Sequence, residues 1–151
     1  MTVYRKLNLF CVCMASGAWA QTFTIPDPAF AAKLEQYVPN AITGNVLSTM
    51  HPDVLALTQM SLGYSNITDL SGVEYFTGLE ILSCHNNQLT SLPPLPLSVR
   101  HFGCDENQIT ELPPLHEGLE ELHVDYNQLT SLPELPSTLT VLVCSSNLLS
   151  E

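Results

Sequence analysis

An asparagine recurs every 20 residues in the second half of the sequence, at positions 87, 107, 127 and 147. The segments around it, 79–89, 99–109, 119–129 and 139–149, fit the pattern L-x-x-L-x-L-x-x-N-x-L, with other apolar residues replacing some leucines. A fixed period of this length is typical of a solenoid, in which each repeat forms one coil. Solenoids present a long regular surface, so the repeat favours a binding scaffold over a closed catalytic pocket.

Each repeat contains an alternating stretch that predicts a short strand, and strands of successive coils are expected to stack in parallel. The asparagine follows the strand, where its amide can donate to and accept from backbone groups that the turn leaves unpaired. We therefore predict a structural ladder of Asn87, Asn107, Asn127 and Asn147. Two core columns accompany it: Leu82, Phe102, Leu122 and Leu142, and Leu89, Ile109, Leu129 and Leu149.

The return half of each repeat is rich in proline, in segments 90–98, 110–118 and 130–138. Proline removes a backbone donor and fixes φ, so these segments cannot form helices and should run extended, near polyproline II. Six leucines are expected to face inward from them: Leu92, Leu95, Leu112, Leu115, Leu132 and Leu135. The predicted fold is a mainly β, or α/β-type, curved right-handed solenoid with one short parallel strand per coil and an extended convex side.

The first 20 residues resemble a secretory signal peptide, with Arg5 and Lys6, an apolar stretch, and Ala18-Trp19-Ala20 as the cleavage site. Cleavage after Ala20 predicts a secreted, cell-surface or periplasmic product without membrane insertion.

Residues 21–56 are predicted to form an N-terminal cap. Asp27 is an N-cap candidate, Pro28 suits the first helical position, and a second helical turn is expected after Ser48. The repeats then span 57–78, 79–98, 99–118, 119–138 and 139–151. The first is 22 residues long, has Ser65 at the asparagine position, and lacks proline in its return, which allows a short helical turn.

The repeat 139–151 is incomplete. Its apolar edge would be open to pairing. We expect either that the chain is part of a longer product or that another molecule covers this edge, self-association included.

After removal of the signal peptide only Lys33 and Arg100 remain positive, against 15 carboxylates, so the net charge is 2 − 15 = −13. Nucleic acid and anionic membranes need clustered Lys and Arg, and both are therefore excluded as partners. The acidity is consistent with solubility of an exported protein or with a basic partner.

Cys84, Cys104 and Cys144 occupy one repeat position, which Val124 fills in the remaining repeat. We predict buried, reduced thiols that act as small hydrophobic groups.

The variable strand positions gather polar and aromatic side chains on one face, which we take as the partner-binding surface. Its predicted residues are His85, His101, Asp105, Glu106, Glu121, His123, Asp125, Tyr126, Val141 and Val143. No cofactor is expected. An alternative uses His101, Glu121 and His123 as ligands for a divalent metal, although no recognised ligand spacing supports it. A hydrolase is the weakest interpretation, because no G-x-S-x-G motif is present.

The stretch 57–151 closely resembles leucine-rich repeats, and its 20-residue "LPxLP" form is similar to the bacterial type. "IPDPAF" and "NITDLSGVEYFTGLEIL" are similar to the opening of exported surface members of that group. The resemblance implies non-catalytic recognition of a protein on the concave strand face. A recognition arm of a larger effector or adhesin is the alternative.

Overall fold

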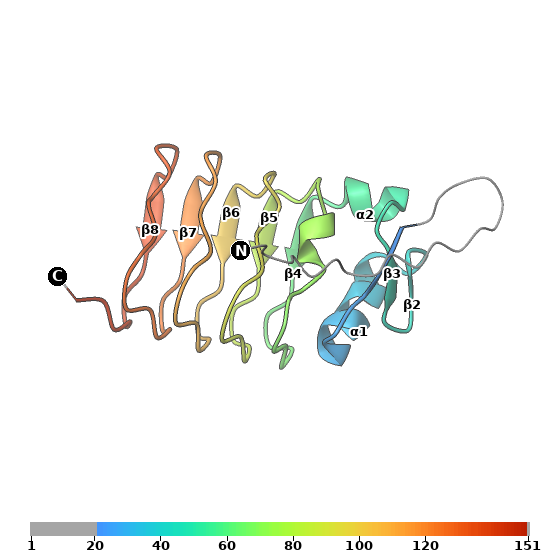
Figure 1. Cartoon of the computed structure of the whole chain (residues 1–151), viewed down its shortest axis with the longest axis horizontal. Helices are drawn as coiled ribbons and strands as arrows, with labels where there is room; N and C mark the ends of the chain where they lie inside the picture. The colour runs from blue at the N-terminus through green and yellow to red at the C-terminus, as the bar shows by residue number, and fades with distance from the viewer. Residues whose placement is uncertain (1–20, 151) are drawn as a thin grey trace, which may run out of the picture.

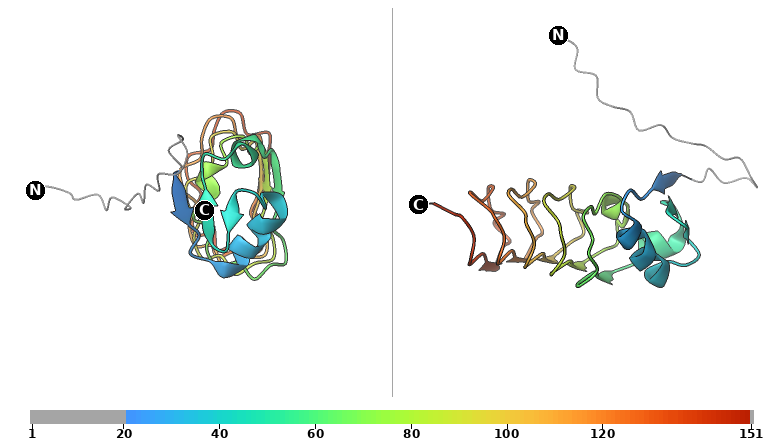
Figure 2. Two further views of the ribbon diagram at one scale, coloured as in Figure 1. Left: turned by 90° about the vertical axis from the view of Figure 1, so that its right-hand side faces the viewer. Right: turned by 90° about the horizontal axis from the view of Figure 1, so that it is seen from below.

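The computed structural model describes residues 21–150, and the predicted signal peptide lies outside the described residues. A small N-terminal cap is followed by stacked coils that lead away from it in one direction (Figure 1). Seen along this direction, the coils overlie one another as one closed outline (Figure 2).

One short strand per coil builds a parallel five-stranded sheet in the order β4-β5-β6-β7-β8. The register advances by one repeat between strands, so that Leu82, Phe102 and Leu122 lie side by side. The predicted solenoid with parallel strands is confirmed. The strand bounds are β4 Gln59–Ser61, β5 Ile81–Ser83, β6 His101–Gly103, β7 Glu121–His123 and β8 Val141–Val143.

The middle residue of each strand points into the solenoid, where Met60, Leu82, Phe102 and Leu122 are buried. The cysteine position lies beside this column. Cys84 and Cys104 are buried free thiols, as predicted, whereas Cys144 in the last coil is only partly buried. Burial, followed by the neighbouring thiol of Cys84, raises the pKa of the Cys104 thiol well above its ordinary value. Both buried cysteines therefore act as apolar core residues.

The asparagine side chains join each coil to the preceding one through the backbone. Asn107 Nδ2 donates to the carbonyl of Cys104 in its own coil at 3.0 Å and to that of Cys84 in the preceding coil at 3.1 Å. Its Oδ1 accepts from Leu89 N, also in the preceding coil, at 3.0 Å. Asn127 and Asn147 repeat this pattern.

The residue before each ladder asparagine has a left-handed backbone. Asn86, Glu106, Tyr126 and Ser146 all have φ between 51° and 54°. A positive φ suits glycine or asparagine and is unfavourable for other side chains. Three of these four turns therefore keep a residue type that the backbone does not prefer.

The return segments carry no regular secondary structure after the first coil. Five of the six leucines predicted to face inward pack against the core. Leu135 is the exception: its prediction is wrong, because this side chain is 41% exposed. It lies in the return of the 119–138 repeat, and no following return segment lies beside it among the described residues. The first return contains the expected helical turn, η1 Val73–Tyr75.

The cap contains two helices, α1 Pro28–Tyr37 and α2 Pro52–Ala56. As predicted, Asp27 is the N-cap of α1 and accepts a hydrogen bond from Phe30 N at 2.8 Å, with Pro28 at the first position. The sequence did not predict the antiparallel sheet β1-β3-β2 beside them. Its strands are β1 Thr22–Thr24, β2 Ile42–Thr43 and β3 Val46–Ser48.

Two side chains fasten the cap to the first coil. Asp27 Oδ2 accepts from the backbone N–H and the hydroxyl of Thr68, at 2.8 and 2.7 Å. Tyr37 covers the free edge of β4, where its hydroxyl donates to Ser61 O at 2.9 Å and accepts from Ser61 N at 2.8 Å. No helix in residues 21–150 has the length and apolarity needed to cross a bilayer.

Candidate binding surface on the outward face of the sheet

The outer two residues of each strand point away from the core, because the strands alternate around one buried residue. We call these positions, with the three residues that follow each strand, the strand face. In register across it lie Ile81, His101, Glu121 and Val141, and then Ser83, Gly103, His123 and Val143. The predicted columns of the binding surface are thus the columns that the structure forms.

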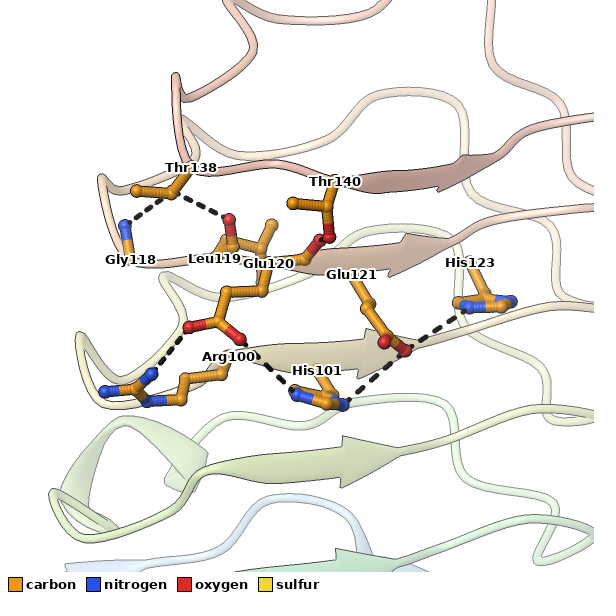
Figure 3. Close-up of polar contacts among 9 residues, drawn as sticks. All are labelled: Arg100, His101, Gly118, Leu119, Glu120, Glu121, His123, Thr138 and Thr140. Carbon is orange, nitrogen blue, oxygen red and sulfur yellow. Dashed lines mark hydrogen bonds and ion pairs between the residues drawn. The ribbon is translucent and has the colours of Figure 1, made fainter.

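Glu121 stands between two histidines in the middle of the strand face (Figure 3). Its Oε2 lies 3.5 Å from His101 Nδ1 on the neighbouring strand and 4.0 Å from His123 Nε2 on its own strand. All three side chains are about two-fifths exposed. The carboxylate is therefore oriented by both imidazoles and remains open to solvent.

Arg100 and Glu120 form an ion pair just before strands β6 and β7. The distance from Arg100 Nη1 to Glu120 Oε1 is 2.5 Å, and Glu120 Oε2 lies 3.8 Å from His101 Nε2 (Figure 3). The sequence analysis did not include these two residues. Their spacing of 20 residues, which makes them neighbours in adjacent coils, was the signal that could have found them.

A groove of about 400 Å³ surrounds this ion pair at the start of the strands. It is lined by Glu80, Leu97, Ser98, Arg100, Gly118, Glu120 and Thr138. Leu97 beside it is 81% exposed. Because Arg100 is already paired with Glu120, the groove has no uncompensated cation to attract an anionic ligand.

Asp105 and Asp125 lie on the strand face as predicted, but they also hold the coils together. Asp105 Oδ1 accepts from Asp125 N at 3.0 Å, and Asp125 Oδ1 accepts from Ser145 N at 2.6 Å. One oxygen of each carboxylate thus satisfies a backbone donor of the next coil. These two residues combine a structural role with exposure to a partner.

Aromatic side chains line the edge of the strand face that follows the strands. Tyr126 is 63% exposed and Tyr64 is 72% exposed. Tyr64 packs edge-on against His85, with 5.1 Å between the ring centroids. Glu106 lies in the same row and accepts a hydrogen bond from Asn86 Nδ2 at 2.6 Å. Tyr64 was missed by the sequence analysis, because its coil lacks the asparagine that marks the later ones.

The predicted metal candidates His101, Glu121 and His123 are neighbours, as described above. Within residues 21–150, however, no group of three or more His, Cys, Asp or Glu side chains is arranged to hold a metal ion. Zinc needs three or four donors converging at about 2 Å. The alternative of metal-dependent binding therefore has no ligand set in the described part of the chain.

The coils and their face define an open repeat solenoid, and comparisons with known proteins agree with this class. A family model described as leucine-rich repeats in two copies matches residues 56–97. The functional domain of InlJ from Listeria monocytogenes, described as including a cysteine ladder, is 29% identical with a TM-score of 0.71. The similarity covers 85% of this chain and 29% of the InlJ chain. A comparison with curated proteins found no match.

The chain therefore carries a leucine-rich-repeat solenoid of the bacterial type. It spans less than a third of the length of the InlJ chain that it matches.

Proposed function

We propose that this chain is a non-catalytic recognition module that binds a protein partner on its strand face. The observation that carries the proposal is the composition of this face. A paired glutamate, two histidines, an exposed tyrosine and an apolar end at Val141 lie on one continuous sheet surface. Protein interfaces typically surround an apolar or aromatic centre with polar groups. The class supports the same function, since solenoids use such extended faces for binding.

The face offers no arrangement that would suggest catalysis. Its carboxylates and imidazoles lie on an open surface, about two-fifths exposed. General acid–base and nucleophilic catalysis depend on groups with shifted pKa values in a site that excludes water. Binding is the function that an open, mixed polar and aromatic surface supports best.

Random short peptides displayed on phage and selected on the purified protein would test this function. Each selected peptide is then measured by calorimetry against Tyr126→Ala and Val141→Ser. We expect Tyr126→Ala to weaken binding about tenfold, because aromatic anchors carry much of an interface's free energy.

The matched control is Leu97→Ser, which removes an exposed apolar side chain outside the strand face. Peptides that ignore both strand-face variants and lose affinity for Leu97→Ser would contradict the proposal.

We also propose that the protein acts outside the cytoplasm, on the strength of the signal-peptide pattern in residues 1–20. The intact mass of the native product tests this. A mass matching residues 21–151 in the extracellular or periplasmic fraction would support export and cleavage after Ala20. A larger mass would support the alternative, a recognition arm of a longer effector or adhesin. Retention of residues 1–20 in the cytoplasm would contradict export.

A further inference from the structure

We propose that the strand face docks a basic segment of a protein partner, with a lysine or arginine side chain seated over Gly103 between Asp105 and Glu121. This inference rests on the proposed function and specifies the chemistry of the partner. It depends on three observations: the missing side chain at Gly103, the orientation of the two carboxylates, and the charge of the surrounding face.

Gly103 leaves an unfilled position in the middle of the strand face. It lies in register between Ser83 and His123, at an outward-pointing site. A Cβ atom added there would lie 3.8 Å from Asp105 Oδ2 and 3.9 Å from His123 Cβ, which is ordinary van der Waals contact. Gly103 is also absent from the residues with positive φ. Neither packing nor backbone conformation therefore requires glycine at this position.

Gly63 shows the opposite case on the same face. A Cβ atom there would lie 2.5 Å from the imidazole of His85, so the protein's own side chain already fills the space. At Gly103 no side chain of this chain takes that place. The position is thus available to a side chain of a partner.

Two carboxylates are held at the edges of this position. Asp105 is fixed through Oδ1, which accepts from Asp125 N at 3.0 Å, and its Oδ2 is the atom nearest to the missing Cβ. Glu121 pairs in register with His101 and is therefore diagonal to Gly103. Its Oε2 is oriented by His101 and His123 at 3.5 and 4.0 Å. Carboxylates fixed in this way lose little conformational entropy when they bind a cation.

The protein supplies no cation of its own to this position. Residues 21–150 contain two positive side chains, Lys33 and Arg100, and 14 carboxylates, so their net charge is 2 − 14 = −12. Arg100 is paired with Glu120, and Lys33 lies in α1 of the cap. Charge complementarity therefore selects a basic partner and repels nucleic acid and anionic lipid. Arginine suits two carboxylates especially well, because its guanidinium group presents donors in a planar fork.

The test uses the peptides selected on the purified protein and three further variants. Gly103→Val fills the position, and the fold should accept it because Val143 occupies the same column. Glu121→Gln removes one charge on the strand face. Glu134→Gln is the matched control, since Glu134 is exposed and lies in a return segment. Thermal melting checks that each variant is folded.

We expect the selected peptides to be rich in lysine or arginine and to bind about tenfold more weakly to Gly103→Val and to Glu121→Gln. Affinity for Glu134→Gln should stay close to that of the unmodified protein. Binding should also weaken with added salt, because exposed charges are screened.

Neutral or acidic peptides that ignore Gly103→Val and Glu121→Gln, yet are lost on Tyr126→Ala, would overturn the basic partner and leave the proposed function in place. Peptides that ignore every strand-face variant, or a selection that yields no binder, would overturn both.

Discussion

Asn107 and Cys84 belong to adjacent coils, and the side-chain amide of Asn107 donates to the main-chain carbonyl of Cys84 at 3.1 Å. The ladder of asparagines thus works through the backbone of the preceding coil. Each buried amide uses both of its functional groups, as a polar side chain in a core must. Fastening of this kind supports short strands of three residues, which offer few ladder hydrogen bonds of their own.

Replacing Asn107 by alanine should lower the free energy of unfolding by about 1–3 kcal/mol, because it leaves buried backbone groups without partners. Urea denaturation followed by circular dichroism measures this loss. Gln108→Ala is the matched control, since Gln108 is the adjacent amide side chain and is exposed. Equal stability of the two variants would contradict the structural role of the ladder.

Acid should loosen the contact between the cap and the first coil. Burial on its own raises the pKa of Asp27, but hydrogen bonds from Phe30, Thr68 and Ala29 outweigh it and lower this pKa below its ordinary value. A carboxyl group with a lowered pKa in the folded state stabilises the fold above its unfolded pKa, and this contribution is lost as the pH falls through the folded value. We therefore expect stability to decline below about pH 4.

Melting curves of Asp27→Asn over the same pH range check this expectation. The variant should be less stable at neutral pH and should lose less stability on acidification. Glu35→Gln, on the exposed side of the same helix, serves as the control. An unchanged pH profile for Asp27→Asn would show that another group governs the acid response.

His116 occupies a position that proline fills in the neighbouring coils. Its carbonyl accepts from Leu119 N at 3.3 Å, just as the carbonyls of Pro96 and Pro136 accept from Val99 N and Leu139 N. Within the described chain neither buried ring nitrogen of His116 has a hydrogen-bond partner. His116→Pro should therefore raise stability by about 0.4–1 kcal/mol, since it restricts the unfolded chain at a site whose turn accepts proline.

Thermal denaturation of His116→Pro and His116→Ala tests the explanation. Alanine removes the unpaired nitrogens but does not restrict φ, so it should stabilise less than proline. A destabilised proline variant would mean that the backbone of this coil differs from those of its neighbours.

Tyr126 keeps an aromatic side chain at a φ of 51°. Asparagine tolerates this conformation better, so Tyr126→Asn should raise the free energy of unfolding by up to about 1 kcal/mol. The same change removes an exposed aromatic anchor and should weaken peptide binding. Ser146→Asn, at the equivalent position of the last coil, should stabilise without the loss of binding. Unchanged or tighter peptide binding by Tyr126→Asn would remove this residue from the binding surface.

The three cysteines should differ in reactivity although they share one repeat position. Cys84 and Cys104 are buried, whereas Cys144 is partly exposed. Thiolates are the reactive species, and burial raises the pKa of Cys104, so alkylation of the native protein should reach Cys144 first. Mass spectrometry of labelled peptides follows the order of modification. Equal labelling rates at Cys104 and Cys144 would indicate that the middle coils open readily.

The sequence predicted the coils because period and burial agree in this fold. Asn107 and Phe102 recur at fixed intervals, and each interval corresponds to one turn of the solenoid. The β1-β3-β2 sheet of the cap was missed because strands of two or three residues, such as Ile42–Thr43, are too short to show an alternating pattern. Leu135 was wrongly placed inside because the pattern carries no information about which coil has a neighbour on both sides.

The candidate site was predicted as a set of columns but not as a set of contacts. The period placed His101 beside Glu121 correctly. It could not reveal that Asp105 bonds to the backbone of the next coil, because rotamers and hydrogen bonds leave no periodic signal. The effect of Gly103 was also hidden, since an unfilled position is defined by its neighbours in space.

The asparagine contacts give the solenoid a direction of assembly. Asn87 Oδ1 accepts from Ser65 N and Ile67 N, so the turn of one coil is satisfied only by a side chain that comes about 20 residues later. A chain that emerges amino end first cannot close a coil until the next one has arrived. Order would then spread outward from the cap one coil at a time, and the newest coil would always be the least complete.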